Sequence, residues 1–312
     1  MRNIRILAVA ALVLAYLQIV FGAIVRITGS GLGCGDHWPD CYGSFTPVHP
    51  GIGLLIEISH RYGAAILSTT VFVLAIVAYI NRDEQSVGGP GGALRSSIAA
   101  AGLVILAALV GAATVKLGLN PIVIVTHLAI AMSLLAVLSI TVLRAGELGA
   151  LSDMRGASPR TWRAARIAVI LAALTLLLGA LTANVPDAAI ACGGFPWCRS
   201  VNAGGTPLIL QITHRVIAFL LFGHLWGVAA ALPKRNEPSS LVRAARIAFG
   251  LAVLQVLIAA AMVEMHLPTV LRSLHQATGT LLWVSVCVFA GLARIAAPAE
   301  SKSARSLTPE PA

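Results

Sequence analysis

Charged residues are scarce in this chain of 312 residues. Asp, Glu, Lys and Arg together make up 11% of the sequence, whereas hydrophobic residues make up 58%. An average soluble domain carries about 25% charged residues. The shortage of charge therefore excludes a water-soluble domain of this length, and it directs attention to the apolar segments that fill the chain instead.

Apolar runs of about 20 residues are long enough to cross the hydrocarbon core of a bilayer as helices. The sequence contains eight such runs, and they predict an all-α integral membrane protein with eight transmembrane helices. The runs are Ile6–Val25, Leu55–Ile80, Ser97–Val115, Pro121–Leu143, Arg166–Ala183, Leu208–Leu232, Ala244–Val263 and Val270–Ile295.

The first apolar run lacks a convincing cleavage site. Arg2 and Arg5 precede the run, as basic residues precede the core of a signal peptide. The run is long, however, and it leads into a polar loop without a cleavage motif. We therefore expect this segment to be retained as a helix.

Acidic residues are fewer than basic ones, 12 against 22, which gives a net charge of +10. The basic residues are spread over separate loops, so we expect contact with anionic membrane lipid and no nucleic-acid partner. Sixteen of the 22 fall on one side of the expected membrane and six on the other. Because cytoplasmic loops are enriched in Lys and Arg, we predict a multi-pass protein of the cell membrane with both termini cytoplasmic. The basic residues expected on the outer side are Arg26, Arg61, Lys116, Arg199, Arg215 and Arg272.

The second half of the chain repeats the first in the kind and spacing of its polar residues. The matched pairs are His60 and His214, His127 and His275, Cys34 and Cys192, and Cys41 and Cys198, at offsets of 154, 148, 158 and 157 residues. Because every even-numbered helix enters from the outer side, both copies have the same topology, related by an axis along the membrane normal. We predict two pseudo-symmetric four-helix bundles, residues 1–150 and 151–297, followed by a disordered cytoplasmic tail, residues 298–312.

Cysteine is rare, with five residues in all. Four of them lie in two long loops on the expected extracytoplasmic side: Cys34, Cys41, Cys192 and Cys198. Disulfide bonds persist in that compartment. Cys287 lies inside the last apolar run, where a small apolar side chain is the better interpretation.

Four histidines occupy the first turns of helices that enter from the outer side: His60, His127, His214 and His275. At about 1.5 Å per residue they lie at similar depth, so two imidazoles can face each other within each half. Polar residues also hold membrane helices together, but four histidines at repeat-equivalent positions favour ligation. Zinc usually recruits a Cys, an Asp or a third His, whereas two imidazoles on opposite faces of a flat macrocycle suit haem iron.

The residues around the first histidine of each copy carry further chemistry. Arg61 and Arg215 follow it directly, and each could pair with haem propionates or simply extend its charged head to the interface. Three residues before the histidine the copies differ, with Glu57 in the first and Gln211 in the second. Glu57 can donate or accept a proton, so we interpret it as a proton-handling acid. The alternative is an ion pair with Arg61 at a helix N-terminus.

The combined stretches resemble a known family over about Ile6 to Ile295. They are Arg26-Ile27-Thr28-Gly29-Ser30-Gly31-Leu32 with the cysteine pair that follows, Glu57-Ile58-Ser59-His60-Arg61, Thr126-His127, Gln211-Ile212-Thr213-His214-Arg215 and His275-Gln276. They are similar to the haem A synthase family, in its cysteine-bearing bacterial branch. The resemblance implies oxidation of the C8 methyl group of haem o to a formyl group, by two hydroxylations and loss of water, to supply haem a for terminal oxidase assembly.

Carried over residue by residue, the resemblance implies that His60 and His127 hold the substrate haem o, with Glu57 as the catalytic acid beside it. It implies that His214 and His275 ligate the iron of a permanent haem b, which passes electrons across. The implied disulfides are Cys34–Cys41 and Cys192–Cys198. Expected partners are haem o synthase, the oxidase assembly apparatus and an electron donor that no motif identifies.

Two other functions would use many of the same residues. A di-haem b-type electron-transfer cytochrome of the membrane would share the four histidines and give Glu57 no special role. A transporter with a proton relay through Glu57 would fit the repeat, but the sequence has no broken helices near the middle of the membrane. The haem content of the purified protein distinguishes the three functions.

Overall fold

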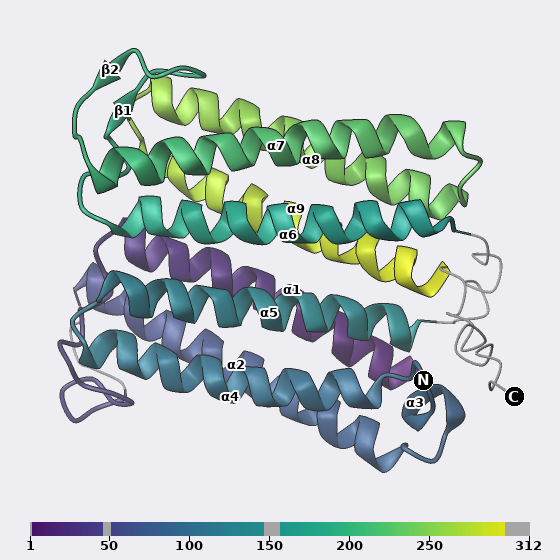
Figure 1. Cartoon of the computed structure of the whole chain (residues 1–312). Helices are drawn as coiled ribbons and strands as arrows, with labels where there is room; N and C mark the ends of the chain where they lie inside the picture. Colours follow the sequence, from purple (N-terminus) through teal and green to yellow (C-terminus); the bar gives the residue numbers. More distant parts are fainter. Residues whose placement is uncertain (1, 46–50, 147–156, 297–312) are drawn as a thin grey trace, which may run out of the picture.

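The computed structural model describes residues 2–45, 51–146 and 157–296. Over these ranges the chain is mainly helical, with one small two-stranded hairpin (Figure 1). The long helices are α1 (Arg2–Ile27), α2 (Ile52–Ile80), α4 (Leu94–Lys116), α5 (Pro121–Ala145), α6 (Pro159–Asn184), α7 (Thr206–Lys234), α8 (Ser239–Glu264) and α9 (Thr269–Ala296). The short elements are α3 (Gln85–Gly88), β1 (Cys192–Gly193) and β2 (Ser200–Val201).

The helices extend beyond the apolar runs, because hydropathy marks only the part of a helix that suits the hydrocarbon core. The largest difference is at α6, which was expected from Arg166 and begins at Pro159. Ser158 caps this helix by accepting a hydrogen bond from the backbone N–H of Thr161 at 3.3 Å. Proline at the first helical position suits this start, since its missing N–H would have no partner there.

Each of the eight long helices in the described ranges is long and apolar enough to cross a membrane, with 23 to 29 residues apiece. About 20 residues suffice to span the hydrocarbon core. Helices are suited to that environment because they satisfy their backbone polar groups internally. The prediction of an all-α, multi-pass membrane protein with eight spans is confirmed, and the side that each terminus faces stays a prediction.

The helices pack as two groups of four that meet along a seam (Figure 1). The first group comprises α1, α2, α4 and α5, and the second comprises α6 to α9. Across the seam, α9 packs on α1 and α5, and α5 packs on α6. Trp283 in α9 donates its indole N–H to the carbonyl of Met132 in α5 at 2.9 Å, and the hydroxyl of Tyr16 in α1 donates to the carbonyl of Ala277 in α9 at 3.3 Å. One apolar core runs through both groups, so the seam is closely packed.

The loops with the cysteines lie together at one end of the molecule. Figure 1 shows α1 beginning and α9 ending at the opposite end from β1 and β2. We call the end that holds β1, β2 and both cysteine pairs the cysteine-loop end. The boundary predicted near residue 150 and the tail predicted for residues 298–312 lie outside the described residues, so both stay predictions.

At the other end, a buried carboxylate joins α6 to the loop between α7 and α8. Glu237 is 8% exposed. It accepts hydrogen bonds from the backbone N–H of Ser158 at 3.2 Å and from the hydroxyls of Ser158 and Thr161 at 2.5 and 2.6 Å. Hydrogen bonds to a charged group contribute more than neutral ones. This carboxylate therefore fixes the start of α6 against α7 and α8.

We expect the Glu237→Ala variant to lose about 2 kcal/mol of its free energy of unfolding, because the donors of Ser158 and Thr161 are left without their acceptor. Glu237→Gln keeps one side-chain oxygen and should lose less. Unfolding in detergent measures the effect, with the exposed Asp83 changed to Ala as the control. If Glu237→Ala and Asp83→Ala unfolded at the same point, the carboxylate would have no stabilising role.

Candidate functional site

Two imidazoles line one cavity in the second group of helices. His214 lies in α7 and His275 in α9. Both face a cavity whose walls also include Gly179 of α6, Gln255 of α8 and Gly279 of α9, and most of its other lining residues are apolar. The structure therefore brings together the second predicted pair of histidines.

A backbone carbonyl fixes the state of the His214 ring. Its Nδ1 lies 3.1 Å from the carbonyl oxygen of Thr175. Because a carbonyl oxygen can only accept, Nδ1 is the nitrogen that carries the proton in this contact. The Nε2 atom then keeps its lone pair, which is the form of imidazole that coordinates a metal.

The histidines of the first group, His60 in α2 and His127 in α5, are near enough to interact electrostatically. The ring of His60 packs beside Phe21, with 6.0 Å between ring centroids. The Nδ1 atom of His127 is buried and has no hydrogen-bond partner among the described residues. Buried polar atoms are nearly always paired, and the backbone of Ala107 in α4 also acts on the His127 ring, so this imidazole is held at the contact between α4 and α5.

Three glycines on neighbouring helices give the imidazoles room. A Cβ atom built on Gly22 would come 2.9 Å from Nε2 of His60, and one on Gly179 would come 2.8 Å from Cε1 of His214. One on Gly111 would come 3.1 Å from Cε1 of His127. The sequence interpretation missed these glycines. Gly22 and Gly179 are 157 residues apart, the same offset as Cys41 and Cys198, and that spacing could have identified them.

These features fit a flat macrocycle held between two imidazoles. The glycines allow a close approach of ring and backbone, the walls of the cavity in the second group are mostly apolar, and Nε2 of His214 keeps its lone pair. The described residues include no group of three or more His, Cys, Asp or Glu side chains that could hold a metal ion. A structural zinc site requires such a group, whereas haem iron takes two axial ligands from the protein.

Gln255 distinguishes the second site from the first. Its Nε2 lies 3.1 Å from Nδ1 of His275 and 3.0 Å from the backbone oxygen of His275, and its Oε1 has no partner among the described residues. The residue 20 positions before His127, the counterpart of Gln255, is Ala107. A side-chain amide therefore holds His275 in the second group, whereas in the first group it is the backbone of Ala107 that acts on His127.

Both cysteine loops are closed by disulfides. Cys34 is bonded to Cys41 with a Cα–Cα distance of 4.9 Å, and Cys192 to Cys198 with 5.2 Å. These are the pairs that the family resemblance implied. Cys287 is free and buried in α9, in agreement with a packing role.

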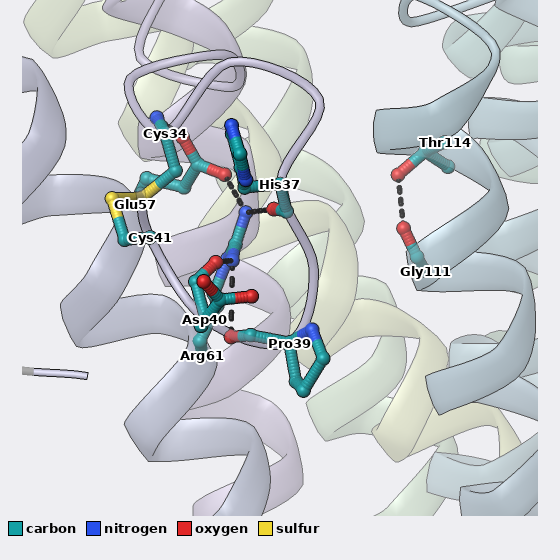
Figure 2. A network of polar contacts seen from close by, with 9 residues as sticks. All are labelled: Cys34, His37, Pro39, Asp40, Cys41, Glu57, Arg61, Gly111 and Thr114. Atoms are coloured by element: carbon teal, nitrogen blue, oxygen red, sulfur yellow. Dashed lines mark hydrogen bonds and ion pairs between the residues drawn. A yellow bond between two sulfur atoms is a disulfide. The ribbon is translucent and has the colours of Figure 1, made fainter. Parts of the chain in front are cut away.

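Glu57 connects the first cysteine loop to α2 (Figure 2). Its side chain is buried, with the residue 4% exposed. Its Oε2 accepts from the backbone N–H of Cys34 at 2.9 Å, and its Oε1 accepts from Nη2 of Arg61 at 2.5 Å. The same guanidinium donates to the carbonyls of His37 and Asp40, both at 2.8 Å. We call this set of contacts the loop clamp.

The second group repeats the loop clamp without the acid. The side-chain oxygen of Gln211 accepts from the backbone N–H of Cys192, and its Nε2 donates to the carbonyl of Ala189 at 3.0 Å. Arg215 donates to the carbonyls of Gly194 and Cys192 at 2.8 and 2.9 Å. An amide thus replaces the carboxylate as the acceptor at this position.

The loop clamp bears on two sequence interpretations. The Glu57–Arg61 ion pair, weighed as an alternative, is present. Arg61 and Arg215 direct several N–H groups to loop carbonyls, so these donors already have acceptors within the protein. The propionate role of the two arginines stays a prediction, and their observed role is to hold the loops.

Comparison with known proteins gives consistent matches. The profile of the COX15-CtaA family, described as cytochrome oxidase assembly protein, matches residues 5–51 and 52–287. The chain is 31% identical to the haem A synthase of Alkalihalophilus pseudofirmus, over 72% of this chain and 76% of that protein. It is 28% identical to the haem A synthase of Macrococcus caseolyticus, over 92% and 96% of the two chains. The haem A synthase of Staphylococcus saprophyticus is also 28% identical, over 92% and 95%.

We expect Gly179→Ala to displace His214 and to lower the haem content of the purified protein. The added methyl group would press on the imidazole, and overpacking of this kind costs about 1–3 kcal/mol. Haem per polypeptide, measured on the purified protein, reports the loss. Gly223→Ala in α7 is the matched control, since its Cβ would meet no atom within 4 Å. Equal haem in the two variants would contradict the role given to Gly179.

Proposed function

Because this chain belongs to the haem A synthase family, we propose that it oxidises the C8 methyl group of haem o to the formyl group of haem a. The enzyme is accordingly an oxidoreductase that acts on a haem substrate. The observation that carries the proposal is the duplicated histidine pair with an acid in only one copy. This arrangement suits one site for a substrate that is changed and one for a haem that is kept.

We assign the substrate to the first group of helices. His60 and His127 would hold the iron of haem o, and Gly22 and Gly111 leave space beside the two rings. Glu57 lies three residues before His60 and is therefore about one helical turn from it on the same face. A buried acid at that distance is well placed to accept or deliver a proton as the methyl group is oxidised.

The hydrogen bonds of Glu57 do not prevent this role. Each oxygen of an ionised carboxylate can accept more than one hydrogen bond. Oε1 accepts from Arg61 and Oε2 from the backbone of Cys34, which leaves one lone pair on each oxygen. In this proposal Glu57 both holds the loop and handles a proton, whereas Gln211 only holds its loop.

We assign the resident cofactor, haem b, to the second group, between His214 and His275. A bound haem b would supply electrons one at a time. Thr175 and Gln255 orient the two imidazoles through hydrogen bonds. Trp283 lines the same cavity and donates to the backbone of α5, the helix that carries His127, so an aromatic side chain lies at the contact between the two groups.

The membrane setting completes the proposal. The protein is a multi-pass membrane protein. We propose that both termini are cytoplasmic and that the cysteine loops face outward, as the distribution of basic residues predicts. The source of haem o would be a haem o synthase in the same membrane, and the product would pass to terminal oxidase assembly. The electron donor is a further partner that no residue pattern identifies.

Pigment extraction from the purified protein tests the proposal against a di-haem b cytochrome. We expect haem b together with haem o or haem a, and an increase in haem a when haem o is supplied. Two equivalents of haem b, with no haem o or a even when haem o is supplied, would establish the cytochrome instead.

Substitutions of Glu57 separate its two roles. We expect Glu57→Gln to keep the cysteine loop in place, because Gln211 already accepts from the corresponding amide in the second copy. Haem a formation should nevertheless fall by about 100-fold or more, the usual contribution of a proton-transferring side chain. Glu57→Ala should lose the loop contact as well. Haem b spectra and haem a yield measure the two effects.

The control for this series is Glu264→Gln, which makes the same chemical change at an exposed acid of the cysteine-loop end. Normal haem a yield in Glu57→Gln would remove the acid from the mechanism and leave Glu57 as part of the loop clamp only.

A further inference from the structure

Two arginines at the cysteine-loop end lack an acidic partner. Arg26 lies in the last turn of α1 and Arg272 in the first turn of α9, and both are partly buried. The ion pairs among the described residues are Arg61–Glu57 and Arg199–Glu264, so neither arginine is neutralised by a carboxylate. Cations that are partly removed from water are stabilised by an anion.

The two side chains converge. The Tyr16–Ala277 hydrogen bond sets the register of the antiparallel pair α1 and α9. Arg26 is ten residues after Tyr16 and Arg272 is five residues before Ala277. At 1.5 Å per residue, they lie about 15 Å and about 7.5 Å from that hydrogen bond toward the cysteine-loop end. Because each Cα–Cβ bond tilts toward the N-terminus of its own helix, Arg26 points back from that end and Arg272 points toward it. Arg272 accordingly acts on Arg26 electrostatically.

Both arginines lie close along the helices to residues that line the cavity of the second group. Arg26 donates from Nη1 to the carbonyl of Ala183 at 3.2 Å. Ala183 is four residues past Gly179, which faces the ring of His214, and Arg272 is three residues before His275. Each arginine is therefore about one helical turn from the level of the imidazoles, on the side of the cysteine-loop end.

We propose that Arg26 and Arg272 bind the propionate carboxylates of the haem held between His214 and His275. This inference rests on the proposed function and goes beyond it, because it identifies the groups that anchor the resident haem. Arg26 comes from the first group of helices, so the second site is completed across the seam. A guanidinium matches a carboxylate with two parallel N–H donors, and such charge-assisted pairs are among the strongest hydrogen bonds.

The first site has no arginine at either of the repeat-equivalent positions. The residue 157 positions after Arg26 is Ala183, and the residue 148 positions before Arg272 is Ile124. Both counterparts are apolar. This difference matches the division of labour: a resident haem benefits from fixed carboxylates, whereas a substrate haem has to leave after it is oxidised.

Arg26 also has a structural contact that the experiment must separate from haem binding. The carbonyl of Ala183 belongs to the last turn of α6, where helix carbonyls have no partner within the helix. One guanidinium carries five N–H groups, so this contact leaves most of them for a carboxylate. Loss of the cap would lower thermal stability, whereas loss of a propionate contact would release haem.

The experiment compares Arg26→Gln, Arg272→Gln and the double variant in the full-length protein. We expect the double variant to release haem b to a haem-scavenging globin about tenfold to hundredfold faster, as for loss of charge-assisted hydrogen bonds. Lys116→Gln removes an exposed charge at the same end of the molecule and serves as the control, with release unchanged.

A second measurement changes the haem as well as the arginines. Wild-type protein produced without haem is loaded in membranes with iron protoporphyrin IX or with its dimethyl ester, whose propionates carry no charge. We expect the ester to leave the wild type as fast as the acid leaves the double variant. The double variant should release acid and ester at the same rate.

The outcomes are distinct. Equal release of haem from the wild type and the double variant would overturn the inference and leave the proposed function in place. Unchanged haem release with loss of co-purified anionic lipid from the double variant would also overturn it, and would assign the arginines to a lipid headgroup. A wild type that binds no haem would overturn the proposed function and this inference with it.

Discussion

The structure depends on one constraint, the need to satisfy backbone polar groups where loops meet the ends of membrane helices. Helices satisfy these groups with hydrogen bonds inside the helix, but the cysteine loops have no such regular pattern. Both loops are held instead by two side chains of the following helix, an acceptor three residues before the histidine and a guanidinium directly after it. Because these contacts fix the height of α2 and α7 against the loops, they also fix the positions of His60 and His214.

Much of this architecture follows from local properties of the sequence. Apolar runs predict the eight helices, and the repeat predicts that His60, His127, His214 and His275 lie at one level, since both depend on composition and spacing along the chain. The closeness of Gly22 and Gly179 to the imidazoles depends on which helices pack together, which periodicity does not determine. The start of α6 was expected too late, because its first turns are basic and capped rather than apolar.

The partners of the arginines next to the histidines could not be predicted from the sequence. Charge and position predict that Arg61 and Arg215 lie near the membrane surface, where a propionate and a backbone carbonyl are both suitable acceptors. Every residue of a loop carries a backbone carbonyl, whatever its side chain. The sequence pattern therefore cannot show whether a loop carbonyl will lie within hydrogen-bond distance of these arginines. In the structure each disulfide-closed loop lies over its arginine, so the loop carbonyls become the acceptors.

The matching contacts of Glu57 and Gln211 have an evolutionary consequence. An amide oxygen holds the second loop in the same way that a carboxylate oxygen holds the first. Exchange of one residue for the other can therefore alter the reactivity of a single copy of the four-helix unit and leave its architecture unchanged.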